Sequence, residues 1–169
     1  MSGIIGVSPD MRSGVVGEFL GGHVVGFAKY ITSGSDISVG HGNSWYNTGI
    51  ALPSYSPRDA SNILVVSFSS QTWSISPTAM TATIHLSEGT VEATGTGGST
   101  SGTAGARVHT ANEDPTALFF SNTWVLPATS TSARTYGIYV VTTHPGSAGT
   151  FYINAGPRYS YMNLYEIQQ

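Results

Sequence analysis

The clearest structural signal in the sequence is an eight-residue alternation of apolar and polar side chains, Met80-Thr81-Ala82-Thr83-Ile84-His85-Leu86-Ser87. Successive side chains of a β-strand point to opposite faces of a sheet, so a period of two predicts a strand with one buried face. We expect the four apolar residues to face the core and the four polar residues to face outward.

A second stretch predicts a different kind of strand. Ile63-Leu64-Val65-Val66 is continuously apolar, and the chain then alternates through Ser67-Phe68-Ser69. A continuous apolar run is typical of a strand that is covered on both faces. We therefore expect a central strand whose beginning is buried on both sides.

Similar short runs, β-branched or aromatic and bounded by turn residues, recur along most of the chain. Gly, Pro or Ser/Thr clusters interrupt nearly every stretch that could hold a helix of three turns. The predicted strands cover residues 23–32, 45–52, 63–70, 79–87, 118–126, 135–143, 150–154 and 160–168, with a weaker one at 105–110. This spacing predicts an all-β fold, an antiparallel β-sandwich of the jelly-roll type.

The first twenty residues differ from the rest of the chain. They are punctuated by glycine, carry only short apolar pairs, and are too few to form a core of their own. We predict an extended N-terminal arm over residues 1–20 and one sandwich head over residues 21–169. The arm is expected to dock onto a neighbouring protein through Ile4, Ile5, Val7, Pro9 and Met11.

Charge is scarce. Only 9% of the 169 residues are charged, against about 25% in ordinary soluble proteins. The polar remainder is mostly Ser, Thr, Asn and Gly, so a partner that covers the surface displaces few charges from water. This composition suits a subunit of an assembly, although it also suits many extracellular sandwich modules.

The net charge of −3, with Lys29 as the only lysine, leaves no basic stripe for phosphates, and nucleic acid is not an expected partner. The chain has no cysteine, which excludes disulfides and thiolate metal sites. Neither a signal peptide nor an apolar run near the ~20 residues of a membrane helix is found. We expect synthesis in the cytoplasm and no membrane partner.

Catalytic and metal-binding patterns are weak. The five histidines, His23, His41, His85, His109 and His144, lie far apart, and we interpret them as isolated surface or rim residues rather than metal ligands. The acidic turn at 112–115 could offer oxygens to calcium, but a solvated turn is the simpler interpretation.

Enzymatic motifs give no better support. The loop at 95–102 lacks the lysine of a phosphate-binding loop, and no Gly-x-Ser-x-Gly elbow occurs. Glu88 and Glu92 could form a glycosidase pair, although two solvated acids at a hairpin are commoner. We predict no enzymatic activity, no catalytic residue, no metal and no cofactor.

Aromatic residues are the remaining candidates for a functional surface. Most are expected to belong to the sandwich core, but the tyrosines near the C-terminus exceed what one core edge needs. We select four aromatic residues as candidates for a subunit interface or a glycan contact: Trp45, Tyr46, Tyr159 and Tyr161.

Three short pieces carry a resemblance to a known group. The opening Ser2-Gly3-Ile4-Ile5-Gly6-Val7-Ser8-Pro9-Asp10-Met11-Arg12-Ser13-Gly14-Val15-Val16-Gly17, followed by Gly22-His23-Val24-Val25, resembles small structural proteins of marine tailed bacteriophages. Ser61-Asn62-Ile63-Leu64-Val65 and Asn163-Leu164-Tyr165-Glu166-Ile167-Gln168 resemble a strand and the terminus of the same group. Asn62 stands where that group usually has a basic residue, and Tyr165 where methionine is frequent.

The resemblance spans the chain, with the opening as its most specific part, and it implies a phage particle component with a β-sandwich head. Our leading hypothesis is a non-enzymatic virion structural protein, a capsid-surface decoration or fibre subunit. It would be made in the host cytoplasm and placed on the particle surface as a homotrimer. Its partner would be the major capsid protein or a tail protein of the same phage.

Two alternatives stay open. The protein could be a tail-fibre or receptor-binding protein that recognises a host surface glycan, with Trp45, Tyr46 and the loop at 95–102 lining the site. A depolymerase acting on surface polysaccharide is a third hypothesis, and it would need a carboxylate pair in a cleft.

Overall fold

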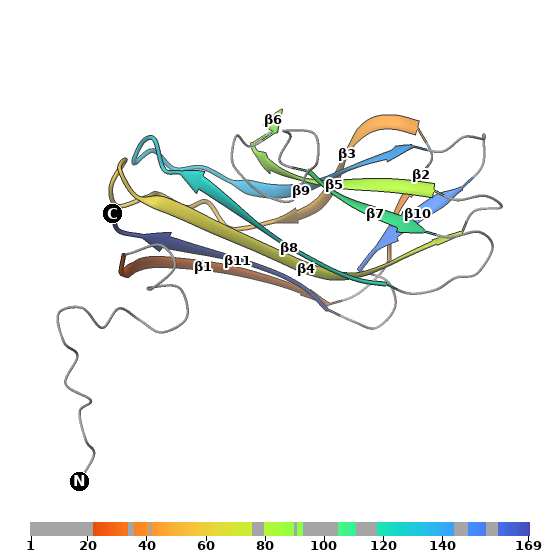
Figure 1. The fold of residues 1–169 in the computed structure, drawn as a ribbon, viewed down its shortest axis with the longest axis horizontal. Coiled ribbons are helices and arrows are strands. Elements are labelled where there is room, and N and C mark those ends of the chain that lie inside the picture. The colour runs from red at the N-terminus through yellow and green to blue at the C-terminus, as the bar shows by residue number, and fades with distance from the viewer. Residues whose placement is uncertain are drawn as a thin grey trace, which may run out of the picture.

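The computed structural model describes residues 22–33, 36–40, 42–75, 80–89, 91–92, 105–110, 118–143, 149–154 and 159–169. All regular elements in these ranges are strands (Figure 1). Their bounds are β1 Val24–Ser33, β2 Ile37–Gly40, β3 Gly42–Ala51, β4 Ile63–Ile75, β5 Met80–Glu88, β6 Val91–Glu92, β7 Gly105–Thr110, β8 Leu118–Pro127, β9 Tyr136–Thr143, β10 Thr150–Ile153 and β11 Tyr159–Ile167. Each predicted strand is present, whereas the short β2 and β6 were not predicted. The described residues contain no helix that could cross a membrane.

The strands form two antiparallel sheets. In the first, β1, β11, β4, β10 and β2 follow one another, and β8 pairs with β4 on its other side. In the second, the order is β3-β9-β5-β6, and β7 also pairs with β5. The long β4 pairs with β11 over residues 63–69 and with β10 over residues 72–75, so one strand holds both parts of the first sheet together.

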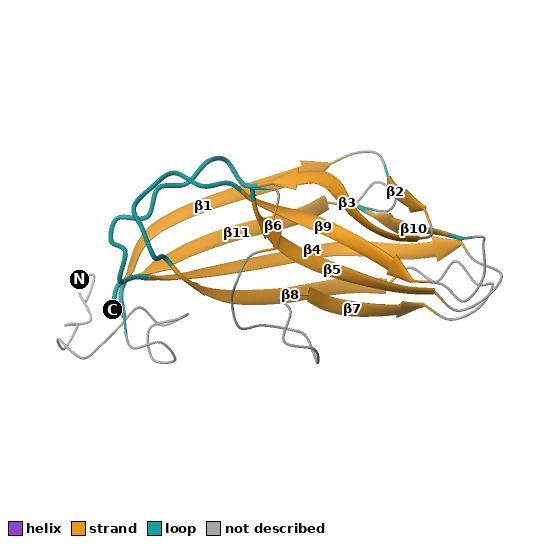
Figure 2. Cartoon of the chain, turned by 90° about the horizontal axis from the view of Figure 1, so that it is seen from above, coloured by secondary structure: helices purple, strands orange, loops and turns teal. Residues whose placement is uncertain are grey.

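The strand order identifies the fold. Without the short β2, β6 and β10, the first sheet reads β1-β11-β4-β8 and the second reads β3-β9-β5-β7. In chain order these are strands 1-8-3-6 and 2-7-4-5, which is the arrangement of a jelly roll built from two Greek keys. The predicted all-β, jelly-roll-like sandwich is therefore confirmed. Figure 2 shows the long strands running along one axis, with described loops gathered at the end where the C-terminus lies.

The core lies between the two sheets. Its largest fully buried side chains come from both layers: Trp124, Tyr136, Phe68, Phe151, Ile50, Leu52, Leu64, Ile84, Leu86, Ile138 and Ile153. The predicted central strand is β4, and its opening residues Leu64, Val65 and Val66 are all buried. Val65 faces away from the core, where Tyr165 and Val125 flank it in the neighbouring strands. Leu64 and Val66 are buried in the core and Val65 is buried by its neighbours on the other face, which explains why the sequence is continuously apolar there.

Strand β5 confirms the predicted alternation, but two of its four outward-facing polar residues, His85 and Ser87, are buried. Ala82, Ile84 and Leu86 face the core and are fully buried, while the side chain of Met80 lies outside the described residues. His85 faces the other way but is also buried, because the Trp45 ring packs 4.8 Å from its ring. The interpretation of His85 as a surface or rim residue is therefore wrong. His23 is exposed as expected.

Other predictions fall outside the described residues. These are the N-terminal arm over 1–20 with its docking residues, the loop at 95–102 and the acidic turn at 112–115. The side chains of His41, His109, His144 and Glu92 are likewise not described.

Candidate interaction surface and a buried carboxylate on strand β11

Strand β11 supplies both regions of interest, because its side chains alternate between two environments. Tyr159 and Tyr161 are exposed, and Asn163 and Tyr165 are partly exposed on the same side. The intervening residues point between the sheets and are fully buried: Ser160, Met162, Leu164 and Glu166. One side of the strand therefore belongs to an outer surface, and the other belongs to the interior.

The outer surface consists of cross-strand rows that run from β1 through β11 and β4 to β8. We call it the outer face and define it by its side chains: Phe27, Tyr165, Val65 and Val125 in one row, Lys29, Asn163, Ser67 and Thr123 in the next, Ile31, Tyr161, Ser69 and Ser121 in the third, and Tyr159, Gln71 and Phe119 beyond them. These rows are fixed by strand register, so the positions follow from the backbone.

Large apolar side chains of the outer face are left in contact with water. Phe27, Ile31 and Tyr159 are each about half exposed, at 49–50%, Tyr161 is 41% exposed, and Phe119 is 73% exposed. Phe27 packs on Tyr165 with ring centroids 5.1 Å apart, and Tyr159 lies 6.1 Å from Tyr161. These side chains form two apolar groups on the outer face, separated by the row of Lys29, Asn163, Ser67 and Thr123, and a surface with this much exposed apolar area often binds a partner.

The polar groups of the outer face are nearly all uncharged. Hydroxyl and amide side chains fill its middle rows, and Lys29 is the one charged residue among those that define the face. A hydroxyl both donates and accepts hydrogen bonds. The surface can therefore be covered without desolvating several charges, which is the costly part of closing an interface.

The second region is the carboxylate of Glu166, which lies under the loop that joins β3 to β4. We call residues 53–62 the strap. Glu166 Oε1 accepts hydrogen bonds from Asn62 Nδ2 at 2.6 Å, from Arg58 N at 2.7 Å and from Asp59 N at 3.3 Å. The Tyr55 hydroxyl donates to Oε2 at 2.6 Å. All four donors belong to the strap, so the carboxylate ties the strap to β11.

The surroundings of Glu166 favour its ionised form. Burial alone would raise its pKa, but the hydrogen bonds from Tyr55, Asn62 and the two backbone N–H groups together outweigh burial and lower the pKa. The Tyr55 hydroxyl shows the reverse effect, because burial and the neighbouring carboxylate raise its pKa. Glu166 is thus a charged acceptor with neutral donors, an arrangement suited to holding structure rather than to transferring protons.

Glycine is required where β1 passes this carboxylate. A Cβ atom on Gly26 would lie 1.8 Å from the Tyr55 hydroxyl and 2.9 Å from Glu166 Oε2. Gly26 pairs with Glu166 in the β1–β11 ladder, directly after an irregularity in the register. The close approach allows Tyr55 to reach the carboxylate across the backbone of β1.

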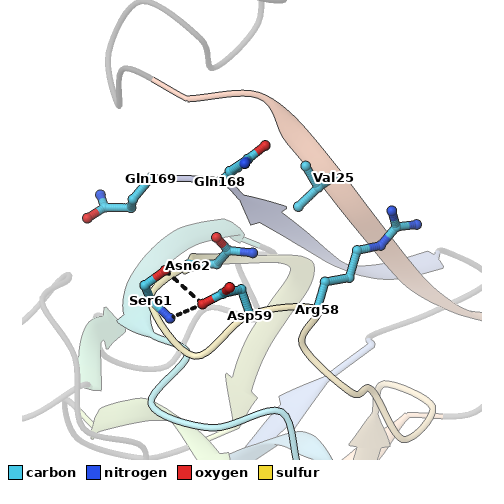
Figure 3. A pocket seen from close by; sticks show the side chains of 7 residues that line it. All are labelled: Val25, Arg58, Asp59, Ser61, Asn62, Gln168 and Gln169. Carbon is cyan, nitrogen blue, oxygen red and sulfur yellow. Dashed lines mark hydrogen bonds between the residues drawn. The ribbon is translucent and has the colours of Figure 1, made fainter.

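A polar pocket of about 330 Å³ lies beside the strap (Figure 3). It is lined by Val25, Arg58, Asp59, Ser61, Asn62, Gln168 and Gln169. The Asp59 carboxylate turns toward its own loop and accepts hydrogen bonds from Ser61 N and Ser61 Oγ, both at 2.8 Å. These bonds lower the pKa of Asp59. No aromatic ring lines the pocket to stack on a sugar, and its acid is already used in a turn.

The four candidate aromatic residues form two separate groups. Tyr159 and Tyr161 belong to the outer face of the first sheet, whereas Trp45 and Tyr46 lie on β3 of the second sheet. The Trp45 ring stacks on Tyr139 at 5.0 Å and packs against His85. Trp45 is partly buried, while Tyr46 is 40% exposed.

The structure also places Glu88, which the sequence offered as one acid of a glycosidase pair, and the candidate metal ligands. Glu88 forms an ion pair with Arg134 at 3.2 Å, and Arg134 also donates to Ser130 O at 2.9 Å and to Ala128 O. Burial is the main reason that the pKa of Tyr136 is raised to about 12. The Glu88 carboxylate adds to this increase, and the Arg134 guanidinium opposes it. Within the described ranges, no three His, Asp or Glu side chains gather as a metal site.

Sequence reasoning did not find the Glu166 network. A signal was present, because an acid occupies an inward-facing position of a strand whose other inward residues include Met162 and Leu164. Two of the three pieces that resemble the phage group also meet here, since Asn62 and Glu166 are hydrogen-bonded. Buried acids require partners, so an acid at an inward-facing position of such a strand is a pattern that indicates a polar network.

No protein-family model matches the sequence, and no curated protein is similar to it. Among solved structures, the VP2 subviral particle of infectious bursal disease virus aligns with a TM-score of 0.40 and 13% identity, over 87% of this chain and 38% of that one. Structures of the Gt and Gx strains of the same virus align with TM-scores of 0.36 and 0.32 at 16% and 15% identity, over 87% and 85% of this chain and 39% and 38% of theirs.

This chain therefore spans about two fifths of the length of these viral proteins. The likeness is too weak to support an argument about function. The jelly-roll assignment rests on the strand order.

Proposed function

We propose that this protein is a non-enzymatic structural subunit of a virus particle, mounted on the particle surface as a capsid decoration or a fibre subunit. The observation that carries the proposal is the outer face, where exposed aromatic and aliphatic side chains surround hydroxyl groups with a single lysine. A surface of this kind is suited to burial against another subunit, because covering it removes apolar area from water at little electrostatic cost.

The chemistry of the described residues is consistent with a structural role. The buried acid Glu166 is saturated by neutral donors, and Glu88 is paired with Arg134. Both are engaged in holding loops to strands. The resemblance of the chain to small structural proteins of tailed phages adds the expectation that the particle is a phage. In that case residues 1–20 are the arm that docks the head onto the major capsid protein or a tail protein.

Immunogold labelling of intact virions, with an antibody raised against the folded protein, tests the proposal. Label spread over the heads is the expected result for a decoration protein, and label confined to the tail is expected for a fibre subunit. Absence of the protein from purified virions, verified by mass spectrometry, would contradict the proposal.

A second candidate function is glycan recognition, and one observation favours it. Trp45, Tyr139 and His85 form an aromatic cluster on the outward side of the second sheet, whereas Tyr46 pairs with the core residue Val140 and belongs to the opposite side. The Trp45 ring is partly exposed, and a partly exposed aromatic ring can stack on a sugar ring. Binding on a glycan array that is lost in Trp45→Ala would support this function, and an array without binding would contradict it.

A further inference from the structure

We infer that the outer face is the surface that a neighbouring copy of this chain covers, so that the subunit acts as a homo-oligomer. The inference rests on the proposed function, because it names the partner that the outer face meets in the assembly. Three properties of the outer face indicate that its partner is a second copy of this chain. They are its exposed area, the chemistry of its polar groups and the position of its only charge.

The exposed area is of the size that a stable interface needs. A large aromatic side chain has about 200 Å² of surface, and five large apolar side chains of the outer face are 41–73% exposed. Together these five side chains expose on the order of 500 Å². The partly exposed Tyr165 and Val125 and the exposed Thr123 add to this area. A standard interface buries about 800 Å² on each partner, so one copy of this face supplies most of one side.

The polar groups of the outer face favour a second copy of this chain as the partner, rather than a different protein that is recognised through opposite charges. A heterologous partner is commonly selected by opposite charges across the interface, and the outer face offers only Lys29 for such a contact. Its hydroxyl residues Ser67 and Ser69 on β4 and Ser121 and Thr123 on β8 can each donate and accept. They can bond to hydroxyl or amide groups on another copy, whose surface is equally poor in charge because only 9% of the chain is charged.

The position of Lys29 is compatible with burial of the rest of the face. Lys29 lies on β1, an outer strand of the first sheet in the described structure, between Phe27 and Ile31 on the same side. A lysine near an edge can lay its apolar stem along neighbouring side chains while its ammonium group reaches water at the rim. The single charge therefore does not prevent a neighbouring copy from covering the aromatic side chains.

The test measures the mass of the full chain in solution by light scattering and sedimentation. We expect a species at a multiple of the 17.7 kDa chain mass, three-fold if the proposed trimer is correct. The double variant Phe27→Ser/Tyr161→Ser should weaken association at least tenfold. Tyr46→Ser is the matched control, because Tyr46 is 40% exposed and Tyr161 is 41% exposed, but Tyr46 lies on the other sheet. The control should assemble as the wild type does.

Circular dichroism spectra establish that each variant is folded, and a second measurement does not depend on removing side chains. The native chain has no cysteine, so the thiol of Asn163→Cys is a unique probe of the middle of the outer face. Its reaction with a maleimide should slow as protein concentration rises. The thiol of Ser132→Cys, in an exposed loop, should react at a constant rate.

A wild type that stays monomeric at about 100 μM, or an oligomer that the Phe27→Ser/Tyr161→Ser variant leaves intact, would overturn the inference. A monomer whose Asn163→Cys thiol is protected at every concentration would also overturn it, and would point to another segment of the same chain as the cover. These failures are distinct from failure of the proposed function. A monomer found on virions overturns only the inference, and an oligomer absent from virions overturns only the virion assignment.

Discussion

The two sides of strand β11 differ in burial and in the partners of their side chains, although they belong to one strand. Inward, Glu166 is buried and every donor around it is directed at its two oxygens. Outward, Tyr159 and Tyr161 remain exposed on a surface that has no cover within the described structure. The inward region is complete in a single chain, whereas the outward region is the surface that we propose a second copy covers.

On β11, the exposure of a side chain and the presence of hydrogen-bond partners indicate its role better than its residue type does. A charged residue is expected on the surface and an aromatic residue in the core, yet on β11 the acid is inside and two tyrosines are outside. The acid is tolerated because neutral donors surround it. The two tyrosines are exposed in the single chain, and aromatic residues are enriched in interfaces.

The largest expected effect is the loss of the carboxylate. Glu166→Gln keeps the size of the side chain but replaces charge-assisted hydrogen bonds, and places an amide N–H₂ among donors. It should lower the free energy of unfolding by about 3 kcal/mol, measured by urea denaturation. Its oligomeric state should match that of the wild type at temperatures where both are folded. A variant as stable as the wild type would show that the network is not what holds the strap.

Acid should reduce the difference in the free energy of unfolding between the wild type and the Glu166→Gln variant. Because the pKa of Glu166 is lowered by folding from its ordinary value of 4.5, its stabilisation is fully present above that value. It is lost as the pH falls through the folded-state pKa. The stability gap between the wild type and Glu166→Gln should be constant near neutral pH and narrow progressively below about pH 4.5. A gap that widens in acid would mean that the folded-state pKa is raised instead.

A smaller effect is expected from filling the space beside the carboxylate. Gly26→Ala would bring a methyl group against the Tyr55 hydroxyl, and we expect it to cost about 2 kcal/mol. Tyr55→Phe removes that hydroxyl and also a hydrogen bond to Glu166. In Tyr55→Phe, the cost of Gly26→Ala should therefore be at least about 1 kcal/mol lower than in the wild type, as a double-mutant cycle would measure. Simple additivity would contradict this geometry.

The smallest effect on folding is expected on the outward side. Tyr161→Ser and Tyr46→Ser should each change the free energy of unfolding by less than about 1 kcal/mol at dilutions that disfavour assembly. Thermal unfolding of both variants at low concentration measures this. A large loss of stability in Tyr161→Ser alone, without any change in assembly, would make the outer face part of the folding core.

Much of the fold was predictable because its signals are local. The alternation through β5 and the apolar opening of β4 identified those strands and their buried sides. The unpredicted β2 and β6 are four and two residues long, too short for a periodicity to be recognised. The burial of His85 could not be predicted, because it depends on the Trp45 ring, which lies in another strand.

The candidate site was predicted only in part for the same reason. Tyr159 and Tyr161 were selected by their number and kind, and they do lie on one surface. Trp45 and Tyr46 were grouped with them although they belong to the other sheet. The strap residues and Glu166 are more than 100 positions apart in the sequence, and no local pattern connects them.

By itself, the sequence determined the all-β class, the faces of the main strands and the scarcity of charge, since period-two patterning and composition act within a few residues or over the whole chain. The tertiary structure alone decided which aromatic residues are covered and which acid is buried among donors. Those outcomes depend on the jelly-roll strand order, which places β1, β11, β4 and β8 side by side and brings residues distant in sequence into contact.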